Sequence, residues 1–306
     1  GEYGPAMKYL EQALELFERG EAGQPDPDVA TSLLNIAATQ VTTGQYRDAE
    51  PHLRRAVALY ERTVGPEHPD TGNALDLLGT VLVRIGRFDE ATRTTHRGLE
   101  IRRATLPPSH ADIARSFNSL GSVYEAMGDD EQALLYYRRS ADGLARSVGE
   151  TSELTAAARI NAASSLVRQG QAEEARRIVL EYLPVFESRL QPTHPYFAHT
   201  FVVLSTSETL LSNPQVGLRW ADKALTLCNS TNVEVQVCAL ARFARARARH
   251  AQGDTDGTIE TAQGSLQVLL DEGSTQSVDT EMIRRWLSEH AAPPSGSNPR
   301  KPQSSE

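Results

Sequence analysis

The chain has 306 residues, 39% of them hydrophobic and 23% charged, with a formal net charge of −9. This composition excludes collagen-like and disordered chains, and no stretch reaches the roughly 18 apolar residues that a membrane-spanning helix needs. A net acidic chain is a poor general binder of nucleic acid or anionic membranes, so we expect neither as a partner.

The two cysteines, Cys228 and Cys238, are too few for a disulfide scaffold. The N-terminal sequence GEYGPAMKYL shows no signal-peptide pattern, which predicts a cytoplasmic protein. A disulfide between the two cysteines is sterically conceivable, but a reducing compartment favours free thiols. The absence of a starting methionine is consistent with a piece of a longer protein.

An internal repeat of 42 residues organises the chain. Gly44, Gly86, Gly128 and Gly170 are each 42 residues apart, and small residues recur in phase on both sides of them. Repetition at a fixed period of this length is typical of solenoids built from stacked structural units. The repeat therefore predicts one elongated array of similar units, in place of one or two ordinary globular domains.

The elements follow from this register in chain order. Residues 1–20 align with the second half of a repeat and are predicted to be a helix whose partner helix is absent. Residues 28–43 carry apolar side chains three and four positions apart, which is typical of a helix that ends at Gly44. A second helix follows, and the linker GPEHPD then stops it. Complete repeats are predicted to start near residues 28, 70, 112, 152, 195 and 233 and to end near 272.

The C-terminal part is predicted to close the array. Residues 279–290 form one more amphipathic helix, which we expect to cap the final repeat, and residues 291–306 are rich in Pro, Ser and Gly, as in a disordered tail. No window shows the alternation of a strand. The predicted fold is all-α, with residues 1–290 forming a solenoid of antiparallel helix pairs.

The residues from Leu120 to Tyr137 carry a recognisable motif. Leu120-Gly121, then Tyr124, Ala133 and Tyr137, match the L-G-x-x-Y … A-x-x-x-F pattern, so the chain resembles the tetratricopeptide repeat. The period of 42 and the G-P-x-H-P linker resemble the kinesin-light-chain subtype of that family. The resemblance implies a right-handed superhelix that binds proteins and has no catalytic activity.

The resemblance also implies where a ligand binds. The first helix of each repeat would line a concave groove, and Asn35, Asn118 and Asn161 match the asparagine ladder that holds an extended peptide in kinesin light chains. Leu77 and Val203 interrupt this ladder. The residues projected onto the groove are Thr31, Leu34, Asn35, Asn73, Asp76, Thr80, Arg84, Arg115, Asn118, Ser122, Asn161, Ser164, Arg168 and His199.

Three arginines of this set suggest the charge of the ligand. Arg84, Arg115 and Arg168 lie on the projected face of an acidic protein, which favours a ligand that carries Asp, Glu or phosphate. The alternative is that these arginines pair with Glu125, Asp76 or other local acids. The sequence favours neither interpretation over the other.

Motifs of catalysis, nucleotide binding and metal binding are absent, so no catalytic residue, cofactor or metal is expected. His68, His110 and His194 do recur in phase. Equivalent residues of successive repeats lie roughly 20 Å apart, too far to share a metal ion. We therefore expect these histidines to pack against or cap the helix that follows each of them.

The segment 239–250, ALARFARARARH, contains Arg242, Arg245, Arg247 and Arg249 without an acid. One interpretation is a site for an anion or an acidic peptide, and the other, which we favour, is a solvated helix face. This segment and the later IRRWLSEH resemble the end of the repeat arrays in bacterial serine/threonine protein kinases of the myxobacterial type. That resemblance implies an alternative function, as the C-terminal regulatory or substrate-recruiting region of a larger signalling enzyme.

Overall fold

The structure is a computed structural model that describes residues 12, 26–230, 233–272 and 277–291. These ranges contain thirteen helices and no strand. The predicted half repeat at 1–20 and the predicted tail lie, almost entirely, outside the described residues. The helices are α2 (Pro27–Thr42), α3 (Tyr46–Thr63), α4 (Pro69–Arg84), α5 (Phe88–Thr105), α6 (Ala111–Met127), α7 (Asp130–Val148), α8 (Glu153–Arg168), α9 (Ala172–Arg189), α10 (Tyr196–Leu210), α11 (Pro214–Ser230), α12 (Val235–Ala251), α13 (Thr258–Asp271) and α14 (Val278–His290).

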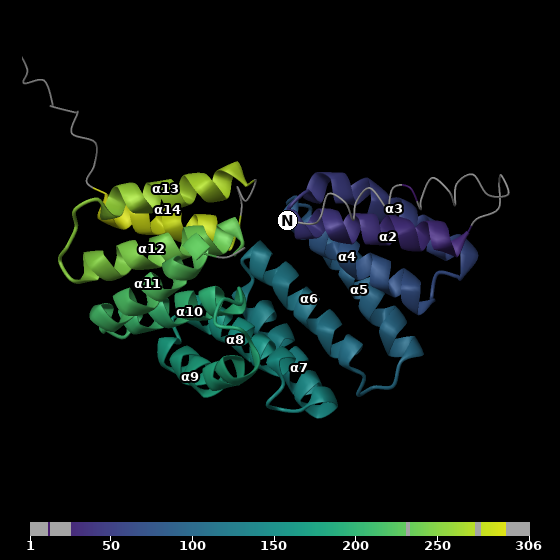
Figure 1. Ribbon diagram of the computed structural model, residues 1–306, viewed down its shortest axis with the longest axis horizontal. Helices are drawn as coiled ribbons and strands as arrows, with labels where there is room; N and C mark the ends of the chain where they lie inside the picture. The colour runs from purple at the N-terminus through teal and green to yellow at the C-terminus, as the bar shows by residue number, and fades with distance from the viewer. Residues whose placement is uncertain (1–11, 13–25, 231–232, 273–276, 292–306) are drawn as a thin grey trace, which may run out of the picture.

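Each helix packs mainly against its neighbours in the chain, from α2 with α3 through to α13 with α14. Contacts also join first helices of successive repeats, such as α4 with α6 and α8 with α10. Figure 1 shows the pairs stacked side by side along a curved path from the N-terminal to the C-terminal end. The prediction of an all-α repeat solenoid is confirmed.

The turn inside each repeat depends on one backbone conformation. Gly44, Gly86, Gly128 and Gly170 have φ values between 78° and 82°, in the left-handed region that only glycine adopts without strain. The fifth repeat has Ser212 at the next position in this 42-residue series, and its φ is 62°. Ser212 is the one non-glycine residue with positive φ in the described ranges. The turn geometry is therefore retained where the preferred residue is missing.

Close packing explains why small residues recur before each turn. A Cβ added to Gly121 would lie 2.6 Å from Cδ1 of Tyr137, too close to the ring of a fully buried side chain on the next helix. A Cβ at Gly79 would meet the hydroxyl of Thr95 in the same way. The helix axes of each pair approach closely because these positions carry no side chain.

The phased histidines cap helices, as the sequence predicted. Nδ1 of His68 accepts a hydrogen bond from the backbone N–H of Asp70 at 3.2 Å, and His110 accepts one from Asp112 at the same distance. His194 accepts from Tyr196 at 3.3 Å. These bonds satisfy N–H groups that the first turn of a helix leaves without partners. No group of three potential metal ligands occurs among the described residues.

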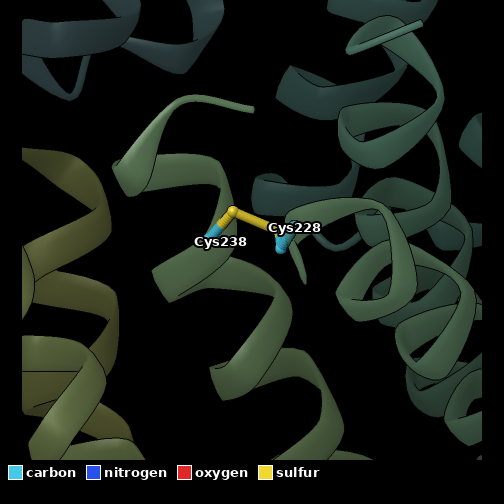
Figure 2. The surroundings of a disulfide bond; sticks show 2 residues. All are labelled: Cys228 and Cys238. Atoms are coloured by element: carbon cyan, nitrogen blue, oxygen red, sulfur yellow. A yellow bond between two sulfur atoms is a disulfide. The ribbon is translucent and has the colours of Figure 1, made fainter. Parts of the chain in front are cut away.

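The prediction of two free thiols is wrong. Cys228, near the end of α11, and Cys238, in the first turn of α12, form a disulfide with Cα atoms 5.7 Å apart (Figure 2). The prediction rested on compartment and not on geometry, whereas the packing of α12 against α11 brings the two side chains together. None of the described helices is long and apolar enough to span a membrane. The cytoplasmic location stays a prediction.

Candidate binding groove

The first helices of the repeats line a cavity of about 820 Å³. The C-terminal end of α4 and the inner faces of α6, α8 and α10 form one side, and α12 and the start of α14 close the other. The array thus curves until its C-terminal helices face its N-terminal half, and α14 contacts α6. The charged, amide-bearing and imidazole-bearing lining residues are Arg84, Asn118, Glu125, Asn161, Arg168, His199, Glu234, Gln236, Arg247 and Asp279.

Half of the residues that the sequence placed in a groove line this cavity. They are Arg84, Asn118, Ser122, Asn161, Ser164, Arg168 and His199. A second cavity of about 240 Å³ adjoins the first, since Asn118, Asn161 and His199 line both, and Arg115 lies in its wall. The two cavities together form the surface that we call the groove.

The six remaining predicted residues, on α2 and α4, line neither cavity: Thr31, Leu34, Asn35, Asn73, Asp76 and Thr80. Thr31 instead exchanges a hydrogen bond with the Tyr60 hydroxyl at 2.9 Å. Asp76 forms a buried ion pair with Arg102, which also donates to Asn73. The projection onto a helix face was wrong for Asp76, because its carboxylate points between α4, α5 and α6 instead of into the groove.

Arg168, at the end of α8, is the centre of the charges in the groove. Its guanidinium lies 2.8 Å from Glu125 and 2.5 Å from Asp130, and only 9% of its side chain is exposed. Burial alone would lower the pKa of Arg168, but Glu125 and the neighbouring carboxylates raise it well above its usual value. Tyr137 completes the cluster by donating its hydroxyl to Glu125. The positive charge of Arg168 is therefore already compensated inside the protein.

The other two predicted arginines also have acidic partners. Arg84 lies 2.9 Å from Glu234 across the cavity and donates to Gln236. Arg115 lies 3.1 Å from Asp112 on its own helix and is more than half exposed. The structure therefore agrees with the alternative interpretation, in which these arginines pair with local acids. Because their charges are compensated within the protein, they give no reason to expect an acidic ligand.

Asn118 and Asn161 meet on the floor between the two cavities. The side-chain amide of Asn161 donates to the side-chain oxygen of Asn118 at 3.0 Å. This bond does not use the amide hydrogens of Asn118 or the oxygen of Asn161, so two residues that line both cavities keep a donor and an acceptor for a ligand. Two members of the predicted ladder thus lie together, whereas Asn35 lies apart from them, outside both cavities.

Two further titratable groups face Arg168. Burial lowers the pKa of His199, an effect that Glu125 opposes and Arg168 reinforces, so the imidazole is neutral at pH 7. Burial raises the pKa of Asp279, in the first turn of α14, to about 6, although Arg168 acts in the opposite direction. The groove therefore contains a carboxyl group that gains or loses its proton near neutral pH.

The sequence interpretation missed the contribution of the C-terminal helices. Arg247 of α12 and Asp279 of α14 line the cavity, although the predicted groove ended at α10. A cap helix was predicted at 279–290, but its approach to α6 depends on the accumulated curvature of the array. The run of arginines at 239–250 was the available signal, and the structure separates Arg247 from the others.

Comparisons with known proteins support the fold. Tetratricopeptide-repeat family models match residues 28–104 and 116–151, and no curated protein sequence matches the chain. The crystal structure of BtubC (BKLC) from P. vanneervenii has a TM-score of 0.61 at 18% identity, covering 76% of this chain and 95% of that one. A putative kinesin light chain from Podosopora anserina has a TM-score of 0.55 at 19% identity, covering 66% and 95%.

A peptide-bound regulator also has this fold. The Rap conjugation gene regulator of the plasmid pLS20, in complex with the Phr* peptide, has a TM-score of 0.65 at 16% identity. The similarity covers 95% of this chain and 72% of the regulator. Kinesin-light-chain-like proteins are thus among the structural neighbours, at identities that show the shared fold alone, and none of these comparisons shows the predicted likeness to myxobacterial kinases. The chain is an all-helical repeat solenoid, and its residues 28–104 and 116–151 match tetratricopeptide-repeat family models.

Proposed function

We propose that the groove binds a short peptide segment of a partner protein and that the chain is a non-catalytic interaction scaffold. The observation that carries this proposal is the cavity of about 820 Å³ on the inner face of the array. Its volume is in the range of sites that enclose a small organic ligand or a few peptide residues. The fold is typical of interaction scaffolds, and the peptide-bound Rap regulator is one of its structural neighbours.

The Asn118–Asn161 pair is suited to a peptide backbone. Asn118 offers amide hydrogens to a peptide carbonyl, and Asn161 offers an oxygen to a peptide N–H. These contacts read no side chain, so they would fix the direction and register of an extended segment. They lie where the large and the small cavity meet, which allows a bound segment to continue into both.

The walls of the cavity supply apolar contact. Val167, Val202 and Val203 come from α8 and α10, and Val237 and Leu240 come from α12 on the opposite side. Burial of apolar ligand surface against such walls contributes roughly 25 cal/mol per Å². We therefore expect the bound peptide to place apolar side chains in the large cavity.

Selection from a peptide library against the immobilised full chain tests this proposal. Ser122 is exposed and lines the cavity, so Ser122→Trp would place a large side chain in the groove. Ser188→Trp on α9 is the matched control, because Ser188 is exposed and lines neither cavity. We expect selected peptides to lose binding to Ser122→Trp and to keep binding to Ser188→Trp. Equal binding to both variants would exclude the groove as the site.

The alternative function, a regulatory region of a larger bacterial kinase or other signalling enzyme, stays a prediction. It is compatible with peptide binding, because a substrate or a segment of the enzyme itself could be the bound partner. The reading frame upstream of Gly1 tests it. A glycine-rich loop followed by an H-R-D motif would support the kinase, and a start codon directly before the array would contradict it.

A further inference from the structure

We propose that Arg247 binds a carboxylate of the peptide, so that one end of the groove selects an anionic group. This inference rests on the proposed peptide function and adds a chemical preference to it. Arg247 lies on α12, lines the large cavity, and comes from a run of arginines that the sequence interpretation favoured as a solvated face.

The four arginines of that run have different surroundings in the structure. Arg245 pairs with Asp222 at 3.0 Å, and Arg249 pairs with Asp254 at 2.8 Å. Arg242 is exposed and lines neither cavity. Arg247 alone of the four turns into the cavity, where its guanidinium lies 5.6 Å from the ring centre of Phe243.

Arg247 also differs from the other arginines of the cavity. Arg84 and Arg168 both form ion pairs with acids that line the same space. Arg247 forms no ion pair or side-chain hydrogen bond within the part of the chain that the structure describes, and its closest described contact is with the ring of Phe243. The five N–H donors of its guanidinium thus have no acceptor among the described residues.

No acid of the groove is available to Arg247. Glu125 and Glu234 are engaged by Arg168 and Arg84, and Asp279 faces Arg168. Glu289 raises the pKa of Arg247 weakly against the dominant effect of burial, which lowers it, and Glu289 itself pairs with Arg285 at 3.2 Å. A carboxylate brought by a ligand would therefore supply a partner that the protein does not provide.

The surroundings of Arg247 would strengthen such a contact. Phe243, Leu269 and Met282 belong to one apolar cluster and line the cavity beside it. Charge-assisted hydrogen bonds between a guanidinium and a carboxylate are stronger where water is excluded, and Arg presents its donors in a fork that matches both oxygens. Phe243 of this cluster lies 5.6 Å from the guanidinium of Arg247, so this ring helps to position the charged group.

The carboxylate could come from the peptide C-terminus or from an Asp or Glu side chain. Three five-residue peptide pools distinguish these sources: a pool with free C-terminal acids and no Asp or Glu, an amidated pool with Asp and Glu, and an amidated pool without them. We expect the wild-type chain to bind one of the first two pools about tenfold to a hundredfold more tightly than the third. Equal binding of all three pools would overturn the inference.

Variants of the full chain test whether Arg247 causes the preference for a carboxylate. Arg247→Gln should bind all pools about equally, Arg247→Lys should recover part of the preference, and Arg245→Gln, the matched control, should behave as wild type. A carboxylate preference that persists in Arg247→Gln would overturn the inference while leaving peptide binding intact. Two other results would contradict the proposed peptide binding as well as the role of Arg247. These are that the wild type binds no pool, or that Ser122→Trp binds the pools as the wild type does.

Discussion

Arg84 and Glu234 lie 150 residues apart in the sequence and 2.9 Å apart in space. Their ion pair connects the end of α4 to the residue before α12 and so bridges the opening of the groove. Glu234 is more than half exposed and Arg84 is partly exposed, so solvent screens the pair. The ion pair therefore marks the place where the C-terminal helices meet the end of α4. It contributes little to the free energy of unfolding.

Breaking this bridge should have a small effect. We expect Arg84→Gln to lower the free energy of unfolding by less than about 1 kcal/mol, since exposed ion pairs contribute little. Urea unfolding of the variant and the wild type measures the difference. A loss of several kcal/mol would show that closure of the array is a main source of its stability.

Removal of Arg168 should have a large effect. Arg168→Met leaves Glu125 and Asp130 without their cation in a site where the arginine is 9% exposed. Removing one partner of a buried ion pair costs about 3–5 kcal/mol, because an uncompensated charge remains. Urea unfolding should show this loss at pH 7. A variant as stable as Arg84→Gln would contradict the central place of Arg168 in the groove.

Asp279 makes stability depend on pH. Its pKa is about 6 in the folded chain against an ordinary value of 3.8, so the folded state holds a proton that the unfolded state has lost between these values. The free energy of unfolding should therefore fall as pH rises from about 4 to about 6, by about 1–3 kcal/mol from this group.

The variant Asp279→Asn should lack this fall and should be more stable than the wild type at pH 7. Glu281→Gln is the matched control, because Glu281 is an exposed carboxylate in the same turn of α14. Unfolding measured at pH 4, 5, 6 and 7 separates the variants. If Asp279→Asn and the wild type give parallel curves, the carboxyl group of Asp279 is not buried against Arg168.

Ser212 offers a stabilising substitution. Its φ of 62° costs a non-glycine residue about 1–2 kcal/mol, and the equivalent positions in the five other repeats are glycine with positive φ. We expect Ser212→Gly to raise the free energy of unfolding by about 0.5–1 kcal/mol, since glycine also loses more entropy on folding. Thermal unfolding would show the gain, and a decrease would mean that the turn of the fifth repeat differs from the others.

The disulfide should stabilise the last repeat. The loop between Cys228 and Cys238 is short, so the chain-entropy account predicts a loss of about 2–3 kcal/mol in the double variant Cys228→Ser, Cys238→Ser. Maleimide labelling provides a direct check, because the native chain should react only after reduction. Labelling of two thiols in the unreduced protein would contradict the disulfide.

The sequence predicted the features that depend on local pattern. The 42-residue phase located the turns at Gly44 and its equivalents, and the phased histidines were correctly expected to cap helices. Asn118, Asn161 and Arg168 line the cavity, and it was the resemblance to kinesin light chains that projected them onto the inner face of the array.

The sequence could not predict how the array closes. Small rotations between repeats add up over six helix pairs, and they bring Glu234 to Arg84 and Asp279 towards Arg168. No local pattern reports such contacts. Arg247 lines the cavity as a result of the same curvature, whereas Arg245 and Arg249 of the same run pair with Asp222 and Asp254.

The most direct test of the groove as a binding site is photo-crosslinking with a library-selected peptide. A benzophenone at the centre of the peptide would be activated in the complex, and mass spectrometry would locate the linked residues of the chain. The account predicts cross-links to α6, α8, α10 and α12, and their loss in Ser122→Trp but not in Ser188→Trp. Cross-links to α5, α7 and α9, with none to the first helices, would contradict it.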